Sequence, residues 1–110
     1  MADRSAVRPP ARHETPRIDE LALTAARHAD RILLAARDRG ADRWVAYLGP
    51  LPDRLREDGL LDLRAAANRA RAAYGPKDSI RDVVPSELTE PFLESIDRLL
   101  KEIARTLAHR

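Results

Sequence analysis

Residues 16–40 read PRIDELALTAARHADRILLAARDRG, and this stretch decides the fold of the chain. Its apolar residues recur at intervals of three and four, the spacing of one face of an α-helix. Pro16 suits the first turn of a helix with Thr15 as its cap, and Gly40 suits a helix end. A helix of about 22 residues spans ~33 Å, so the rest of the chain can pack along it. The apolar face comprises Ile18, Leu21, Ala22, Ala25, Ala29, Ile32, Leu33 and Ala36.

Three further segments on the C-terminal side of this helix have helical spacing, and Pro and Gly separate them. We expect helices over residues 43–48, over residues 60–74, and from Thr89 to near the C-terminus. Pro50 and Pro52 prevent a continuous helix after residue 48, although one more helical turn fits before Gly59. No alternating apolar and polar run predicts a strand. The chain is therefore predicted to be all-α, a small bundle of three to four main helices joined by Pro/Gly turns.

The N-terminal segment differs in composition from the rest of the chain. Residues 1–15 are rich in Pro, Arg and Ala and contain almost nothing apolar, which predicts a disordered basic tail. A chain of 110 residues has the length of one domain. We therefore assign residues 16–110 to a single helical-bundle domain.

Composition narrows the classes of function. The chain has no cysteine, which excludes disulfides and thiolate metal sites and fits a reducing cytoplasm. No apolar run is long enough for a signal peptide or a membrane span, so we expect a cytoplasmic protein with no membrane contact. The net charge of +2 is carried by residues 1–17, and the remainder is neutral, unlike a domain built to bind phosphates. Richness in Arg and Ala is typical of GC-rich bacterial genomes.

The segment GPKDSIRDVV, residues 75–84 (the 75–84 loop), separates the third and fourth predicted helices. In the structural interpretation, Gly75 and Pro76 end one helix and Asp78 or Ser79 caps a single turn. That turn would point Ile80, Val83 and Val84 into the bundle. In the functional interpretation, a polar patch of the loop binds a small ligand or a partner. The residues of that patch are Lys77, Asp78, Ser79, Arg81 and Asp82.

The same loop carries a resemblance to a known family. Trp44-Val45 is followed by Tyr74-Gly75 and, after three residues, by Ser79-Ile80-x-Asp82. This pattern resembles an uncharacterised family of small bacterial helical proteins with a Trp segment and a Gly-rich Ser-(Ile/Phe)-x-Asp loop. The resemblance implies that the loop is a recurring structural element, and it implies no activity.

Two features predict a protein partner or self-association. Trp44 and Tyr47 are two of only four aromatic residues, and they fit either a core anchor or an interface hot spot. The last helix carries a heptad-like repeat that suits packing within the bundle, against a second copy or in a partner's groove. The repeat comprises Leu93, Ile96, Leu100, Ile103 and Leu107.

A basic face on the third predicted helix leaves DNA binding open as an alternative. Arg64, Asn68 and Arg71 fall on one face with Arg69 beside them, as in a recognition helix. The preceding Pro-rich turn and the nearby Asp58 and Asp62 argue against it.

The remaining chemistry-bearing residues predict neither catalysis nor a cofactor. The histidines, at positions 13, 28 and 109, are scattered, and His28 has Arg31 and Ile32 at ligand spacing, so we expect no metal site. No nucleophile motif or phosphate-binding Gly-rich loop occurs, and we expect no enzyme activity and no cofactor. The favoured interpretation is a protein–protein interaction or regulatory module. The alternatives are a DNA-binding regulator and a small-ligand protein that uses the 75–84 loop.

Overall fold

The computed structural model of the chain describes residues 8–109. These residues form five α-helices and two 3-10 turns, and this part of the chain contains no strand. The prediction of an all-α bundle is therefore confirmed. The helices are α1 (Pro16–Asp38), α2 (Asp42–Leu48), α3 (Leu51–Glu57), α4 (Leu60–Ala72) and α5 (Ser86–Ala108), and the turns are η2 (Arg12–Glu14) and η3 (Ile80–Asp82).

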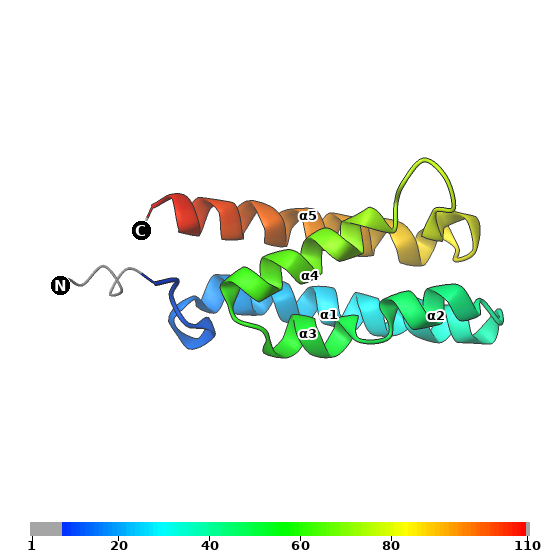
Figure 1. Ribbon diagram of the computed structural model, residues 1–110, viewed down its shortest axis with the longest axis horizontal. Helices are drawn as coiled ribbons and strands as arrows, with labels where there is room; N and C mark the ends of the chain where they lie inside the picture. Colours follow the sequence, from blue (N-terminus) through cyan, green and yellow to red (C-terminus); the bar gives the residue numbers. More distant parts are fainter. Residues whose placement is uncertain (1–7, 110) are drawn as a thin grey trace.

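The helices run alternately up and down a rod measuring 54 × 25 × 21 Å (Figure 1). α1 runs the length of the rod, α2 and α3 return along it, α4 runs forward again, and α5 returns. α1 packs against α5 and against α2 and α3, while α4 packs against α5 and α3. The bundle thus has four helical positions, because α2 and α3 share one of them.

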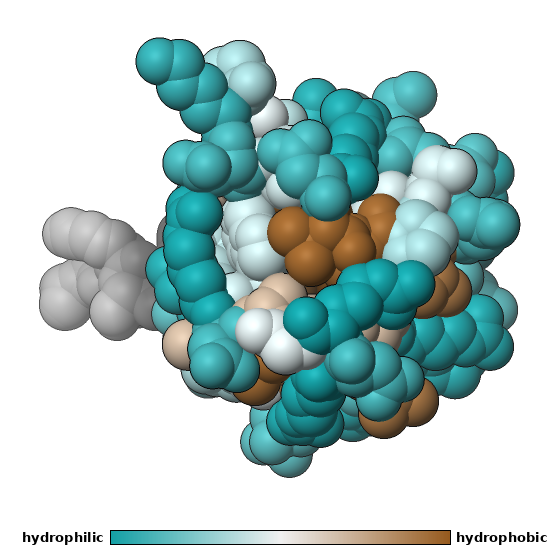
Figure 2. Space-filling model, turned by 90° about the vertical axis from the view of Figure 1, so that its right-hand side faces the viewer, coloured by the Kyte–Doolittle hydropathy of each residue, from teal (hydrophilic) through white to brown (hydrophobic). Residues whose placement is uncertain are grey.

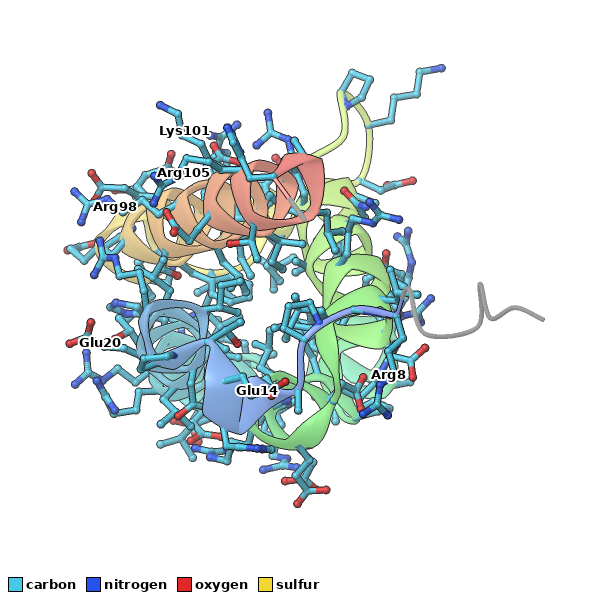
Figure 3. The ribbon with its side chains drawn as sticks, turned by 90° about the vertical axis from the view of Figure 1, so that its left-hand side faces the viewer. Arg8, Glu14, Glu20, Arg98, Lys101 and Arg105 are labelled. Carbon is cyan, nitrogen blue, oxygen red and sulfur yellow. The ribbon has the colours of Figure 1, made fainter. Side chains whose placement is uncertain are left out.

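The core is rich in alanine on α1 and α4, which lets neighbouring helices approach closely. Ala22, Ala25 and Ala36 of α1 and Ala66 and Ala67 of α4 are completely buried. Seen along the rod, charged side chains such as those labelled on α1 and α5 point outward around this core (Figure 3). Within residues 8–109 no helix has both the length and the apolar character needed to cross a bilayer.

The ends of the first three helices follow the predicted turn chemistry. Gly40 adopts a φ of 65°, the left-handed conformation that closes α1 and that glycine tolerates best. Thr15 is the N-cap residue of α1, but its hydroxyl contacts the carbonyls of Ala11 and Arg12 rather than the helix. Pro50 separates α2 from α3, Pro52 lies in the first turn of α3, and α3 forms two turns rather than one.

The last helix begins earlier than Thr89, so the predicted start is wrong. α5 begins at Ser86 after the extended Pro85, and Thr89 is completely buried inside the helix. Pro91 lies within α5. It lies past the first turn, where proline is best tolerated, and leaves the carbonyl of Glu87 without its helical donor.

The buried stripe of α5 is also shifted by one residue at some positions. Ile96 and Ile103 are buried as expected, but the other deeply buried apolar side chains of α5 are Phe92 and Leu99. The residues predicted there lie at the edge of the stripe and are only partly buried: Leu93, Leu100 and Leu107. The helix is therefore rotated slightly from the face that its leucines alone predict.

Part of the segment predicted as tail is structured. η2 precedes α1, and the Arg12 side chain binds Asp19 Oδ1 at 2.7 Å and the Asp58 carbonyl at 2.7 Å. This side chain therefore joins the start of α1 to the junction between α3 and α4. The rest of the predicted tail, residues 1–7, lies outside the described residues.

Apolar side chains also reach the surface. Leu34 of α1, which lies outside the apolar face of that helix, is 59% exposed. At the end of the rod where the 75–84 loop lies, a small group of apolar atoms is surrounded by hydrophilic ones (Figure 2).

Candidate interaction surface

The two aromatic residues of α2 have different environments. Trp44 is only 6% exposed and packs into the core, as favoured from the sequence. Tyr47 is half-buried, and its ring meets the Trp44 ring edge-on with centroids 5.6 Å apart. Trp44 therefore anchors α2, and Tyr47 carries the aromatic surface outward.

Tyr47 contacts Arg69, a residue that the sequence assigned to a different function. The Tyr47 hydroxyl donates to the Arg69 carbonyl at 2.8 Å. The Arg69 guanidinium lies 4.0 Å from the centre of the Tyr47 ring, the geometry of a cation–π contact. The contact forms because α4, running in the opposite direction, passes beside α2 and α3. The contact therefore brings Tyr47, a candidate partner-binding residue, and Arg69, a candidate nucleic-acid-binding residue, together on one surface.

A shallow hollow of about 240 Å³ lies beside this pair, and we call it the Tyr47 hollow. Its volume is below the ~300–1,000 Å³ of small-molecule pockets, so it suits a single side chain better than a free ligand. The lining residues are Tyr47, Pro50, Leu51, Arg54 and Arg69. Pro50, Leu51 and Arg54 were not predictable as site residues from the sequence, because no spacing within one helix shows which residues face α4.

The two arginines of the hollow differ in their partners. Arg54 donates from Nε to Asp58 Oδ2 at 2.9 Å and from Nη2 to the Asp62 carbonyl at 3.2 Å. Within residues 8–109, Arg69 has no carboxylate within ion-pair distance, and neither has Arg64. Asp62 is the only acid on α4. The hollow and the adjoining face of α4 therefore carry uncompensated positive charge.

The other residues predicted to bind nucleic acid are not all without an ion-pair partner. Arg71 Nη1 binds Asp97 Oδ1 of α5 at 2.5 Å, which neutralises it locally. Arg64 and Asn68 are exposed on the outer face of α4. Two of the four predicted groups, Arg69 and Arg71, are therefore engaged within the protein.

The 75–84 loop is held by its own polar groups. Ser79 Oγ accepts from the Arg81 backbone N–H, and Asp82 Oδ2 accepts from the Ser79 backbone N–H, each at 3.1 Å. The Ile80 backbone N–H donates to the Ala73 carbonyl at 2.8 Å. Ile80 is 1% exposed, and Val84 is buried with it. These contacts match the structural interpretation of the loop, with Ser79 as its cap.

Arg81 links the loop to α5 and to Tyr74, which follows the end of α4. It donates from Nε and Nη2 to the two oxygens of Glu90 at 2.9 and 2.8 Å. Its guanidinium also lies 5.1 Å from the centre of the Tyr74 ring, and the Tyr74 hydroxyl donates to the Thr89 carbonyl at 2.5 Å. Hydrogen bonds from Arg81 and, to a lesser extent, from the Thr89 hydroxyl lower the pKa of Glu90 to about 2. Burial raises the pKa of Tyr74.

The two remaining polar candidates of the loop are exposed. Asp78 has a φ of 52° and lies 3.8 Å from Arg43 Nη1 of α2. Lys77 has no acidic partner within ion-pair distance among residues 8–109. Of the five candidate ligand-binding residues in the loop, four are therefore engaged in contacts within the protein.

The histidines do not gather with other metal-binding groups. His28 lies in a groove between α1 and α5, where burial and the nearby Arg31 and Arg27 lower its pKa. Across residues 8–109 no three His, Asp or Glu side chains are grouped closely enough to hold a metal ion.

Comparison with known proteins adds no relative. No family model, curated protein or solved structure matches this chain. The inference of function therefore depends on the surface and on the physical chemistry of its residues.

Proposed function

We propose that this chain is a protein–protein interaction or regulatory module without catalysis, acting in the cytoplasm of a bacterial cell. The observation that carries the proposal is the Tyr47–Arg69 pair at the edge of the Tyr47 hollow. Tyr and Arg are enriched among the residues that contribute most to protein interfaces, especially beside a pocket that an apolar side chain can fill.

The surface around the pair supports the same function. Leu61 of α4 is 48% exposed, and Ala65 and Ala72 are exposed on the same helix. Small apolar residues allow a partner's backbone to approach closely. Together with the hollow they provide an apolar centre with charged groups at its edge, which is the usual anatomy of an interface.

The alternatives have less support. A DNA-binding face would use Arg64, Asn68, Arg69 and Arg71, but Arg71 is paired with Asp97. A ligand site in the 75–84 loop would have to break contacts that hold the loop, including the Arg81–Glu90 pair. Both alternatives therefore require the loss of existing interactions before binding.

Site-specific photo-crosslinking in the cell of origin tests the proposal. A photoreactive amino acid replaces Ala65 beside the hollow or, as a control, Ala104, which is exposed on α5. We expect a discrete crosslinked protein from position 65 and none from position 104. Equal or absent crosslinking at the two positions would contradict an interface on this surface.

A further inference from the structure

We infer that the Tyr47 hollow receives an acidic segment of a partner protein, one that carries an Asp or Glu beside an apolar side chain. The inference rests on the proposed function and specifies the chemistry of the partner. Three properties of the hollow select such a segment: its charge, its lining and its size.

Charge selects an acidic partner. Arg69 and Arg64 have no ion-pair partner within residues 8–109, and Arg54 binds through Nε and Nη2, which leaves Nη1 for another acceptor. The only acid on α4, Asp62, lies in its first turn, where the helix dipole favours a negative charge. A carboxylate placed between Arg54 and Arg69 would receive charge-assisted hydrogen bonds from both.

The Tyr47–Arg69 contact prepares this site before a partner arrives. The Arg69 guanidinium stacks on the Tyr47 ring, so its plane is oriented and part of its conformational freedom is already lost. A guanidinium that is ordered in advance loses less entropy when it binds a carboxylate. The stack therefore favours a bidentate acceptor over a point charge.

The lining and the size of the Tyr47 hollow select an apolar side chain beside the Asp or Glu of the partner. Leu51 and Pro50 provide an apolar floor, and the volume of about 240 Å³ corresponds to one side chain. A segment with an apolar residue next to Asp or Glu can fill the hollow and neutralise the arginines together. A nucleic-acid backbone would satisfy the charge but leave the apolar floor without a partner.

Selection of short random peptides displayed on phage, with the full chain immobilised, tests the inference. We expect the recovered peptides to share an Asp or Glu beside an apolar residue. Their affinity, measured by fluorescence polarisation, should fall by about tenfold, or ~1.4 kcal/mol, with Arg69→Glu. The matched control is Arg31→Glu, an exposed arginine on α1 that also has no ion pair within residues 8–109. We expect this control to leave affinity within about twofold, ~0.4 kcal/mol.

The outcomes separate this inference from the proposed function. Peptides that bind without a shared acid, or that are insensitive to Arg69→Glu, would overturn the acidic partner and leave an interaction module. Failure to recover any binding peptide would overturn both. Circular dichroism confirms that each variant folds, and Arg64→Glu provides a second, exposed position on α4 if Arg69→Glu does not fold.

Parallel measurements test two other occupants of the surface around the Tyr47 hollow. Light scattering that shows a dimer of the wild type and a monomer of Arg69→Glu would assign the surface to a second copy of the chain. Binding of a DNA duplex at low salt that Arg69→Glu abolishes, with no peptide recovered, would assign the surface to nucleic acid. Either result would overturn the acidic segment as the occupant.

Discussion

Ile80 is the side chain on which the connection between α4 and α5 depends. It is 1% exposed, although it lies in a loop, and its backbone N–H is bonded to Ala73. We expect Ile80→Ala to lower the free energy of unfolding by about 2–5 kcal/mol, because it leaves a cavity in the core. Urea denaturation measures the change. Leu61→Ala, which truncates an exposed side chain, should change the free energy of unfolding by less than ~0.5 kcal/mol. Equal losses in the two variants would contradict the dependence of the connection between α4 and α5 on the buried Ile80 side chain.

The Arg81–Glu90 pair predicts a specific pH dependence of stability. The pKa of Glu90 is about 2 in the folded protein, below its unfolded value of about 4.3. The pair therefore stabilises the fold above that unfolded value, and the contribution is lost as pH falls towards about 2. We expect the difference in urea midpoint between the wild type and Glu90→Gln to shrink over this range.

A double-mutant comparison isolates the pair from the other carboxylates. In an Arg81→Gln background, Glu90→Gln should alter the pH dependence much less, because the interacting cation is absent and only the hydrogen bond from the Thr89 hydroxyl remains. An unchanged effect of Glu90→Gln in that background would show that another group lowers the pKa of Glu90.

At the scale of elements, α5 contains a proline that a helix would be more stable without. Pro91 lies inside the helix and cannot donate to the carbonyl of Glu87. We expect Pro91→Ala to raise the free energy of unfolding by about 2 kcal/mol, the ~3 kcal/mol cost of an interior proline less up to ~1 kcal/mol of unfolded-state entropy. Thermal unfolding followed by circular dichroism measures the gain.

Pro85 provides the contrast for this prediction. It lies just before α5 in an extended conformation with a φ of −60°, which proline favours. Pro85→Ala should therefore lower stability by about 0.4–1 kcal/mol. A destabilised Pro91→Ala variant would instead show that the proline ring contributes packing between α1 and α5 that outweighs the missing hydrogen bond.

The elements were predictable from sequence to the extent that their signals are local. The period of α1, the Gly40 stop and the Pro50–Pro52 break each depend on neighbouring residues, and all three are found in the structure. The start of α5 was not predictable from Thr89, because the observed N-cap is Pro85, which lacks a capping side chain, and Thr89 is buried inside the helix. The structured η2 turn depends on contacts of Arg12 with residues far along the chain.

The candidate surface was likewise not predictable from local signals in the sequence. Tyr47 and Arg69 were each predicted as functional residues, but for different partners, because one sequence does not show that α4 passes beside α2. Their contact joins residues 22 positions apart. The volume and charge of the hollow likewise result from the packing of three helices, so a helix period cannot reveal them.

At the scale of the whole molecule, α1 and α5 predict a single cooperative unfolding transition. Both helices run the length of the rod (Figure 1). Their buried faces contribute to one continuous core, which includes both Ile18 and Trp44. Trp44 is the only tryptophan, and its fluorescence reports one end of the rod, whereas circular dichroism reports all the helices. We expect the two urea transitions to have the same midpoint and slope, as in a two-state domain. Loss of the Trp44 signal before the helical signal would show that α2 and the 75–84 loop unfold as a separate unit, and the α2 side of the Tyr47 hollow would then belong to the less stable part of the protein.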